Sequence, residues 1–346
     1  MQRDRPRRDR PVALVTGGAG FIGAHLLREL QEMDRSDLVA LDDLSGGFRD
    51  HVPDGVPFVE GSITDSALVD ALFDEHAFDH VYHLAAYAAE GLSHFIRRFN
   101  YTNNLIGSMN LLNASILHGT KCFVFTSSIA VYGKGQLPMR EDMTPEPEDP
   151  YGIAKYAVEM DLRAAKEMFG LDHVIFRPHN VYGEFQNIGD RYRNVVGIFM
   201  NQILRGEPMT LFGDGEQQRA FSYAGDIVGP IARAPWMESA QGRVFNVGAD
   251  RPCTVNELAA AVAEAMGAAD HPVSYLDARN EVVLAYSDHT AVRECFGDAP
   301  DTPLADGLAK MVSWVKRVGS RTSPVFGNIE VDRNMPPSWR AAMESG

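Results

Sequence analysis

Two residues whose side chains could share one reaction stand four positions apart in the stretch PYGIAKYAVEM, at Tyr151 and Lys155. A helix brings positions i and i+4 onto one face, so the ammonium of Lys155 would lie near the phenol of Tyr151. One positive charge at about 5 Å, in an effective dielectric of about 20, favours the phenolate by roughly 3 kcal/mol, or about two pKa units. We therefore predict that Lys155 lowers the pKa of Tyr151 and that Tyr151 is a general base near neutral pH. Ordinary surface helices contain the same spacing, so the surrounding sequence must decide.

A glycine-rich turn lies near the start of the chain, where a short β-branched strand passes into a helix. The strand is residues 12–16 (VALVT), the turn is GGAGFIG, and the following helix has apolar residues at helical spacing. Its glycines match both GxGxxG and GxxGxxG, patterns that let backbone amides approach a pyrophosphate at a helix N-terminus. This context predicts a dinucleotide site, and the alternative is a glycine-rich loop without a ligand.

An acidic pair follows the second expected strand, residues 38–41. Asp42 and Asp43 stand about twenty residues after the glycine turn, where a ribose-binding acid is expected. An acid at that place repels a 2′-phosphate, which favours NAD over NADP. The alternative is that both aspartates only cap the turn LSGG.

Strands and helices alternate along the next part of the chain, with strands expected at residues 57–60, 80–84 and 121–126 and helices at residues 67–73 and 104–117. This alternation predicts an α/β protein with a doubly wound parallel Rossmann sheet. The last of these strands ends at Ser127 and Ser128, at the carboxyl edge where open α/β sheets bind ligands. Either hydroxyl could hydrogen-bond a substrate oxygen or close an ST-turn. His83, at another strand end, is expected to be a structural histidine.

Charge and composition exclude several classes of protein. A formal net charge of −15 argues against a nucleic-acid-binding surface, which needs a basic face. The three cysteines have neither a disulfide framework nor metal-type spacing, so we expect a reducing, cytoplasmic location and no metal site. No apolar run approaches the roughly 18 residues that cross a bilayer, so no membrane association is expected. Residues 1–10 are expected to be a disordered basic tail, and residues 321–346 an irregular tail on the surface.

The motifs TGGAGFIG, HLAA, TSSIAVYG and YGIAK, together with Asp42, stand in an order that resembles the extended short-chain dehydrogenase/reductase family, the sugar-nucleotide epimerases and dehydratases. The resemblance continues through HNVYG, FGDGEQQRAFSYAGDI and FNVG, and several ordered motifs are far more specific than one. It implies a Rossmann domain at residues 11–178 and a smaller, mainly substrate-binding lobe at residues 179–320, with returns of the chain to the core.

The resemblance also implies the roles of individual residues. Tyr151 would be the base, Lys155 would hold the nicotinamide ribose, and Ser128 would hydrogen-bond the reacting hydroxyl. The cofactor would be NAD, and apart from Tyr151 and Lys155 the residues that hold it would be Gly17, Gly20, Phe21, Ile22, Gly23, Asp42, Ile63, Leu84, Ala85 and Ala86. A nucleotide-sugar substrate would be contacted by Ser127, Ser128, Asn180, Arg219 and Arg279, whose guanidinium groups match phosphate oxygens.

The chain departs from the family pattern at three places. Ala220 stands where an acid is usual, AGD replaces VDD at residues 224–226, and Ser62 replaces an adenine-contacting aspartate. The first two changes could alter the geometry of the lobe. The third could loosen the binding of adenine.

The residues after the strand CFVFT favour one reaction within the family. Dehydratases have an Asp-Glu pair there, decarboxylases a glutamate, and GDP-mannose 3,5-epimerases a cysteine, whereas this chain has Ser127, Ser128, Ile129 and Ala130. Arg193 stands where the 3,5-epimerases have a lysine. Without an added proton-transfer group, we predict 4-epimerisation of a UDP-hexose or UDP-hexuronate through a 4-keto sugar, with hydride return. The alternatives are a GDP-sugar 3,5-epimerase-like or other nucleotide-sugar enzyme and, more remotely, a non-catalytic NAD-binding scaffold.

Two helices, at residues 104–117 and 151–169, carry apolar faces. By resemblance to the family these faces would pair with a second subunit in a four-helix contact, so a homodimer is expected. The alternative is that both faces pack on the chain's own sheet, and the sequence does not separate the two.

Overall fold

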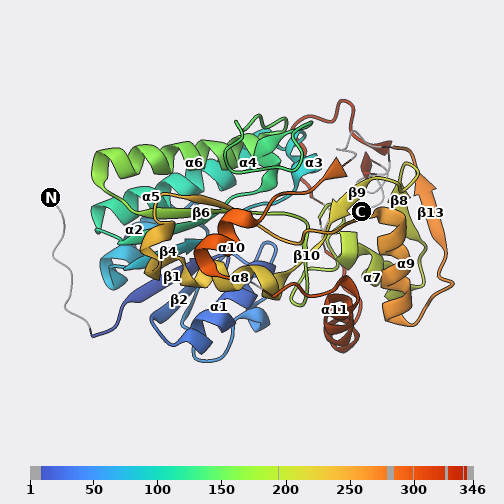
Figure 1. Ribbon diagram of the computed structural model, residues 1–346, viewed down its shortest axis with the longest axis horizontal. Coiled ribbons are helices and arrows are strands. Elements are labelled where there is room, and N and C mark those ends of the chain that lie inside the picture. The colour runs from blue at the N-terminus through green and yellow to red at the C-terminus, as the bar shows by residue number, and fades with distance from the viewer. Residues whose placement is uncertain are drawn as a thin grey trace.

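The computed structural model describes residues 9–193, 195–278, 284–298, 300–323, 326–337 and 339–340. Its centre is a seven-stranded sheet in the order β11-β6-β5-β4-β1-β2-β3, in which every neighbouring pair is parallel (Figure 1). The strands are β1 Val12–Thr16, β2 Asp37–Asp42, β3 Phe58–Glu60, β4 His80–His83, β5 Cys122–Thr126, β6 His173–Pro178 and β11 Val244–Val247. The predicted doubly wound parallel sheet is confirmed.

Helices cover both faces of the sheet (Figure 1). On one face lie α2 Ser66–His76, α5 Gly107–Leu117 and α6 Pro150–Phe169, and on the other lie α1 Phe21–Met33, α8 Ala224–Arg233 and α10 Thr290–Phe296. Successive side chains of a strand point to opposite faces, so Leu14 packs in the cluster under α5 and α6 while Val15 packs in the cluster under α1 and α8. Strands buried on both faces are continuous apolar runs, which is why VALVT and CFVFT were recognisable.

The helix predicted at residues 104–117 is divided. It begins as a π-helical segment, η2 (Thr102–Ile106), which follows α3 (Glu90–Ser93) and α4 (Arg97–Tyr101) and continues into α5. Within it, Asn104 donates to the Asn100 side chain at 2.7 Å, and Asn100 donates to the carbonyl of Pro150 at 2.8 Å. The π-helical turn is therefore tied to the first residue of α6, directly before Tyr151.

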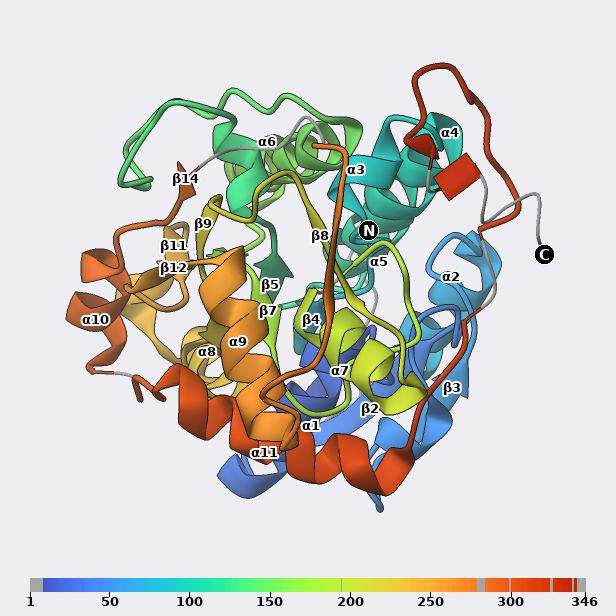
Figure 2. The same cartoon turned by 90° about the vertical axis from the view of Figure 1, so that its right-hand side faces the viewer.

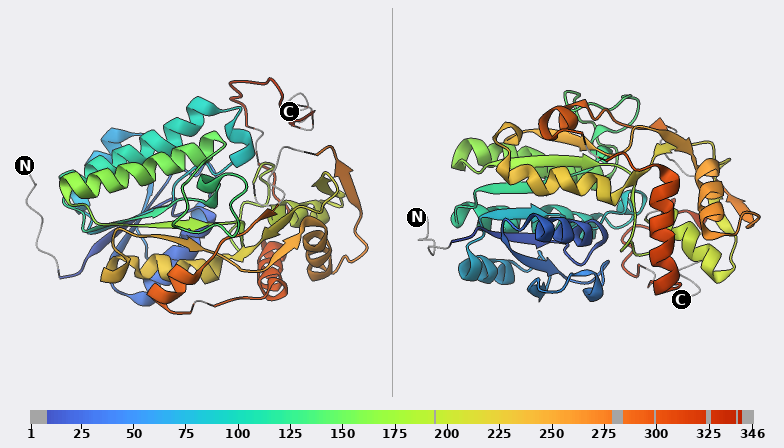
Figure 3. Two further views of the ribbon diagram at one scale, coloured as in Figure 1. Left: turned by 45° about the horizontal axis from the view of Figure 1, so that its top comes forward. Right: turned by 60° about the horizontal axis from the view of Figure 1, so that its bottom comes forward.

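A smaller lobe lies beyond the carboxyl ends of the strands, on the right in Figure 1 and toward the viewer in Figure 2. Its apolar cluster joins Phe199, Leu258 and Leu308, from three different helices. The lobe elements are α7 Val195–Arg205, α9 Val255–Met266, α11 Leu304–Val318, β7 Val181–Tyr182, β8 Met209–Phe212, β9 Gln218–Ala220, β10 Ser222–Tyr223, β12 Pro252–Thr254, β13 Val273–Leu276 and β14 Leu284–Ala285. Between them the chain returns to the larger body as α8, β11 and α10 (Figure 3).

The described part of the segment after α11 contacts both bodies. Near its start, the backbone amide of Arg321 donates to the Asn201 side chain on α7, and Asn201 donates back to the Arg321 carbonyl, each at 2.9 Å. Further along, the carboxylate of Glu330 accepts hydrogen bonds from the backbone amides of Arg98 (2.8 Å) and Phe99 (2.9 Å). These amides belong to the first turn of α4, whose own N-cap supplies no side-chain bond, so Glu330 caps that helix.

Candidate active site

Tyr151 and Lys155 lie on the first two turns of α6, where they face β5. The helix begins with Pro150 and is capped by Asp149, whose side chain accepts from the amide of Gly152 at 3.0 Å. Ser128, the residue after β5, lies close enough to the Tyr151 hydroxyl that its side chain lowers the pKa of the phenol. Lys155 reaches under the tyrosine, with Nζ 5.8 Å from its ring centre and 2.8 Å from the carbonyl of Thr126. Tyr151, Ser128 and Lys155 are therefore brought together, as predicted.

The expected effect of Lys155 on the tyrosine is not found. Burial raises the pKa of Tyr151 well above its ordinary value, against the hydrogen bond with Ser128. Burial also lowers the pKa of Lys155 to about 7, against the neighbouring carboxylate of Glu159, which raises it. The prediction that Lys155 lowers the tyrosine pKa was wrong for this structure, because desolvation of two buried groups outweighs their mutual attraction.

A buried ion pair lies beneath these residues. Glu159 and Arg177 have side chains that are 0% and 1% exposed, and Arg177 donates from Nε and a terminal nitrogen to the two carboxylate oxygens. Ser127 is 2% exposed and donates to the same carboxylate at 2.6 Å. The substrate contact predicted for Ser127 is therefore corrected, because its hydroxyl already serves a buried carboxylate that needs donors. The pair itself was not predicted, although Glu159 stands one turn after Lys155 and Arg177 interrupts an apolar strand.

The glycine turn has the shape that a dinucleotide requires. A Cβ on Gly23 would lie 2.0 Å from the carbonyl oxygen of Gly17, and a Cβ on Gly17, whose φ is +71°, would lie 2.7 Å from the amide of Ala85. The turn closes with a hydrogen bond from the Gly20 amide to the Gly17 carbonyl at 3.0 Å. Phe21 and Ile22 then begin α1, so the free amides of its first turn face the end of β1. These glycines are sterically necessary, because a Cβ at Gly17 or Gly23 would collide with backbone atoms.

Asp42 ends β2 beside this turn. Its carboxylate is 9% exposed and accepts from the amides of Ala19 at 3.1 Å and Leu44 at 2.8 Å. Burial raises the pKa of Asp42, and the hydrogen bond from Leu44 lowers it. The carboxylate therefore caps the loop after β2, as the alternative expectation stated, and it also lies beside Gly20, where it can meet the ribose of NAD.

The other predicted NAD contacts surround the same edge. Leu84, Ala85 and Ala86 follow β4, and the chain there passes close to Gly17. Ile63 is 6% exposed and packs against the start of α5. His83 is held by Thr16 and Ser108, each at 2.8 Å, and burial lowers its pKa to about 3. The expectation that His83 is a structural histidine is confirmed.

The residues predicted for the substrate come from two neighbouring segments of the lobe. Asn180 follows β6, is exposed, and has a φ of +41°, while its carbonyl accepts from the amide of Ser222 at 3.1 Å. Arg219 lies in β9, three residues before the start of β10, and pairs with Cys253 of β12. Arg279 lies outside the described residues. Asn180 directly precedes β7, and the chain from Arg219 leads into β10, which pairs with β7.

Two charged residues near Tyr151 were not predicted as part of the site. Arg193 lowers the pKa of Tyr151 and Glu90 raises it, which places both charges close to the phenol. Arg193 donates from Nε to Asp190 at 2.8 Å, and its guanidinium lies 4.8 Å from the ring centre of Tyr87. Glu90 begins the four-residue helix α3 and Arg193 lies in irregular chain, so neither position carries a periodic signal, and only long-range packing shows that they approach the tyrosine.

Within the described ranges, no group of three or more His, Cys, Asp or Glu side chains is placed to hold a metal ion. None of the helices in those ranges is long and apolar enough to cross a membrane. All three cysteines are free thiols.

Comparison with known proteins agrees with this geometry. Residues 13–248 match the model of the NAD dependent epimerase/dehydratase family. The UDP-glucose 4-epimerase of Mycolicibacterium smegmatis is 34% identical over 310 residues, which cover 88% of this chain and 98% of that protein. Structures similar to this one include UDP-glucose 4-epimerase of Thermotoga maritima with UDP-glucose (TM-score 0.84, 36% identity, 89% of this chain and 99% of that chain). Another is UDP-glucuronic acid 4-epimerase of Bacillus cereus with UDP-glucuronic acid and NAD (TM-score 0.80, 25% identity, 89% and 99%).

The chain therefore belongs to the NAD-dependent epimerase/dehydratase family, the class that its Rossmann sheet, glycine turn and Tyr-Lys pair define. It is an NAD-dependent enzyme of that family.

Proposed function

We propose that this protein is an isomerase that 4-epimerises a nucleotide sugar, either a UDP-hexose or a UDP-hexuronate. The observation that carries the proposal is the grouping of Tyr151, Ser128 and Lys155 at the carboxyl edge of the sheet. Ile129 and Ala130 follow directly, and neither side chain can carry a proton. The similarity to 4-epimerases of UDP-glucose and UDP-glucuronic acid supports the same reaction.

In this proposal the side chains of the protein accept and return one proton, and they hold the sugar in position. NAD, when bound, supplies a reversible hydride acceptor. Tyr151 Oη, in its ionised form, takes the proton of the C4 hydroxyl and later returns it, while Ser128 holds that hydroxyl beside Oη. Lys155 has one hydrogen bond among the described residues, to Thr126, so two of its three N–H donors remain for the ribose. No group at Ile129 or Ala130 moves a proton at C3 or C5.

The test is product analysis by NMR in D2O, with UDP-, GDP- and dTDP-sugars. We expect C4 inversion without uptake of deuterium into the sugar. Tyr151→Phe should lower turnover by about a thousandfold, because it removes the proton acceptor. Tyr156→Phe, one turn away on the same helix, is the matched control and should retain turnover. An unchanged rate in Tyr151→Phe contradicts the proposal, and no product from any sugar favours the scaffold alternative.

One observation favours a second candidate, 3,5-epimerisation of a GDP-sugar. Arg193, which stands where that subgroup has a lysine, acts on the pKa of Tyr151. However, an arginine stays protonated and this one is paired with Asp190, so it is a poor proton carrier. Deuterium at C3 or C5 of the product, lost in Arg193→Gln, would establish this second reaction.

We also propose that the protein is a homodimer formed through α5 and α6, which lie side by side on one face (Figure 3). Large apolar side chains on and beside these helices are exposed, including Ile153 (40%), Met160 (55%) and Phe169 (63%). Ile153 and Met160, seven residues apart, lie on one face of α6, and exposed apolar side chains that share a face mark a protein contact. Light scattering after gel filtration should give a dimer, and Met160→Glu should give a monomer. Tyr275→Glu, at a residue of β13 that is 57% exposed, is the control and should remain dimeric.

A cytoplasmic location is proposed from the thiols. Burial raises the pKa of Cys122 to about 12 and that of Cys253 to about 11, so both stay protonated and unreactive. Free cysteines of this kind are typical of reducing compartments. Fractionation of the source cells, followed by detection of the chain, tests the location.

A further inference from the structure

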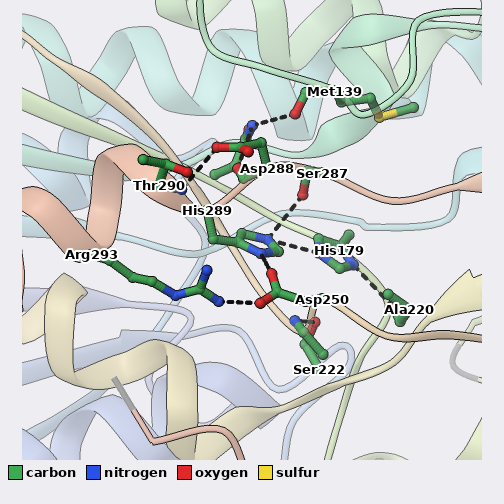
Figure 4. Close-up of polar contacts among 12 residues, drawn as sticks. Met139, His179, Ala220, Ser222, Asp250, Ser287, Asp288, His289, Thr290 and Arg293 are labelled. Atoms are coloured by element: carbon green, nitrogen blue, oxygen red, sulfur yellow. Dashed lines mark hydrogen bonds and ion pairs between the residues drawn. The ribbon is translucent and has the colours of Figure 1, made fainter. Parts of the chain in front are cut away.

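A second buried polar cluster lies outside the Tyr151 site, where the end of β6 meets the chain between β14 and α10 (Figure 4). His179 follows β6, Asp250 follows β11, and Ser287 and His289 precede α10. The two histidines are 3% and 2% exposed. Gly248 makes room for them, because a Cβ there would lie 2.3 Å from Nε2 of His179.

The hydrogen bonds of this cluster require one proton more than neutral side chains provide. Nδ1 of His179 lies 3.0 Å from the carbonyl of Ala220, which only accepts, so Nδ1 carries a proton. Nδ1 of His289 lies 2.6 Å from a carboxylate oxygen of Asp250 and carries a proton for the same reason. The two Nε2 atoms then face each other at 3.1 Å, and in neutral rings both are acceptors. The contact is a hydrogen bond only when one ring is an imidazolium.

His289 is the ring that takes this proton. Burial lowers the pKa of His179 to about 3, and its contacts leave it a neutral acceptor at Nε2. The pKa of His289 is also lowered, because burial outweighs the hydrogen bond and charge of Asp250, which raise it. When His289 loses the proton, Ser287 Oγ, which lies 3.0 Å from the same Nε2, can donate to it instead. The cluster therefore has two hydrogen-bonding states, one with a bridge between the histidines and one without.

The bridge ends on the backbone that carries the predicted substrate residues. His179 directly precedes Asn180, and its Nδ1 bonds the carbonyl of Ala220, which directly follows Arg219. The bridge thus connects both residues, through one imidazole, to Asp250 and to the chain before α10.

We propose that His179 is a positioning residue for nucleotide-sugar binding, and that a proton on His289 tightens this binding by completing the bridge that holds Asn180 and Arg219. This inference rests on the proposed function, because that function assigns Asn180 and Arg219 to the substrate. Coupling is reciprocal, so binding of the nucleotide sugar should also raise the pKa of His289.

Charges from every neighbouring element act on this ring. Asp250 and Asp288 favour its protonation, and Arg293 of α10 opposes it. The small pocket that His289 lines is also bordered by two further carboxylates, Asp226 of α8 and Asp301. Acidic groups are in excess around the ring, which is consistent with proton uptake there.

Two variants of His289 each hold the cluster in one of its two hydrogen-bonding states, with or without the bridge to His179. In His289→Gln the side-chain amide reaches the place of Nε2 and donates to His179 at any pH. In His289→Asn the shorter amide keeps the place of Nδ1 beside Asp250 and has no atom to meet His179. Ser287→Ala is a third variant, which removes the donor of the neutral state and should move the proton uptake of His289 to higher pH.

The experiment combines histidine ¹H–¹⁵N NMR with calorimetric titration of UDP-glucose at about pH 5.5 and about pH 7.5, on either side of an ordinary histidine pKa. UDP-glucose is the probe because its pyrophosphate keeps both charges over this range. The wild type should bind about fivefold more weakly at the higher pH, the equivalent of one net hydrogen bond. His289→Gln should bind tightly at both pH values and His289→Asn weakly at both. NMR should show both ring nitrogens of His289 protonated at the lower pH, with His179 neutral throughout.

Several outcomes overturn the inference. Equal pH dependence in wild type, His289→Gln and His289→Asn, with His289 neutral at both pH values, removes the positioning role and leaves the proposed function standing. If neither UDP-glucose, UDP-glucuronate nor GDP-mannose binds the wild type at either pH, the proposed function fails together with the inference.

Discussion

Two buried polar networks lie near the carboxyl end of β6. They differ in whether every contact pairs a hydrogen-bond donor with an acceptor when the histidines are neutral. Around Glu159, the carboxylate receives donors from Arg177 and Ser127, and each contact joins a donor to an acceptor. Around His289, two Nε2 atoms face each other at 3.1 Å and lack a proton when both rings are neutral. The first network is therefore fixed over the working range of pH, whereas the second can change with pH. A buried polar network supports the fold when each of its acceptors has a donor. When a donor proton is missing, the network can respond to a change of pH.

The largest expected effect is on the first network. Glu159→Gln removes the partner charge of Arg177, whose side chain is 1% exposed, and should lower the free energy of unfolding by about 3–5 kcal/mol. The double variant Glu159→Leu/Arg177→Met removes both charges and should recover most of this loss. Urea denaturation at neutral pH measures both. A loss below about 1 kcal/mol in the single variant would show that the pair is not a fixed support.

Next in size is the pH dependence that Lys155 contributes. Its pKa is about 7 in the folded chain and 10.5 in an ordinary lysine, so between these values the unfolded chain binds more protons. The free energy of unfolding should therefore rise with pH above about 7, by at most about 1.4 kcal/mol per pH unit. Lys155→Met should remove this rise in urea denaturation at a series of pH values. Identical slopes in wild type and variant would contradict the lowered pKa.

Ser127→Ala sharpens the contrast between the two serines after β5. It removes one donor of the buried Glu159 carboxylate, so the free energy of unfolding should fall by about 1–2 kcal/mol while turnover remains. Ser128→Ala should instead lower turnover by about a hundredfold and leave stability nearly unchanged, because the Ser128 side chain acts on the Tyr151 phenol. Thermal denaturation and turnover, measured on both variants, check the pair. A loss of turnover in Ser127→Ala would restore the substrate contact that was corrected above.

The smallest effect on stability is expected in the second network. Asp250 has a side chain that is 44% exposed, so Asp250→Asn should change the free energy of unfolding by less than about 1 kcal/mol. The same variant should move the protonation of His289 to lower pH, because the charge that raises the pKa is lost. Histidine NMR and urea denaturation report the two quantities separately. A large loss of stability without a shift of the His289 titration would make Asp250 a structural residue only.

The central sheet and the start of the site were predictable because their signals are local. The strand VALVT, the glycine turn and the helix after it are contiguous, and the spacing of Tyr151 and Lys155 follows from one turn of helix. The end of β2 also placed Asp42 beside the turn without knowledge of any distant residue. Where a contact is made within one strand–turn–helix unit, the types and spacing of its residues are enough to predict it from the sequence.

The rest depends on burial and on distant partners. The partner of Ser127 lies 32 residues away, and His179 and His289 are separated by 110 residues. The lowered pKa of Lys155 comes first from burial, which spacing does not reveal. One signal was available, because the charged Arg177 within the apolar strand HVIFRP needs a buried partner. Even so, the sequence does not say which carboxylate that partner is.

The segment after α11 sets a geometric limit on the movement of the lobe. It is anchored on the lobe by Arg321 and on the sheet domain by Glu330 at the start of α4. The chain between these two residues has a contour length of roughly 30 Å when fully extended. While both anchors hold, their two attachment points cannot move farther apart than this length. A separation of the attachment points beyond this length requires release of the Glu330 carboxylate from the helix that it caps.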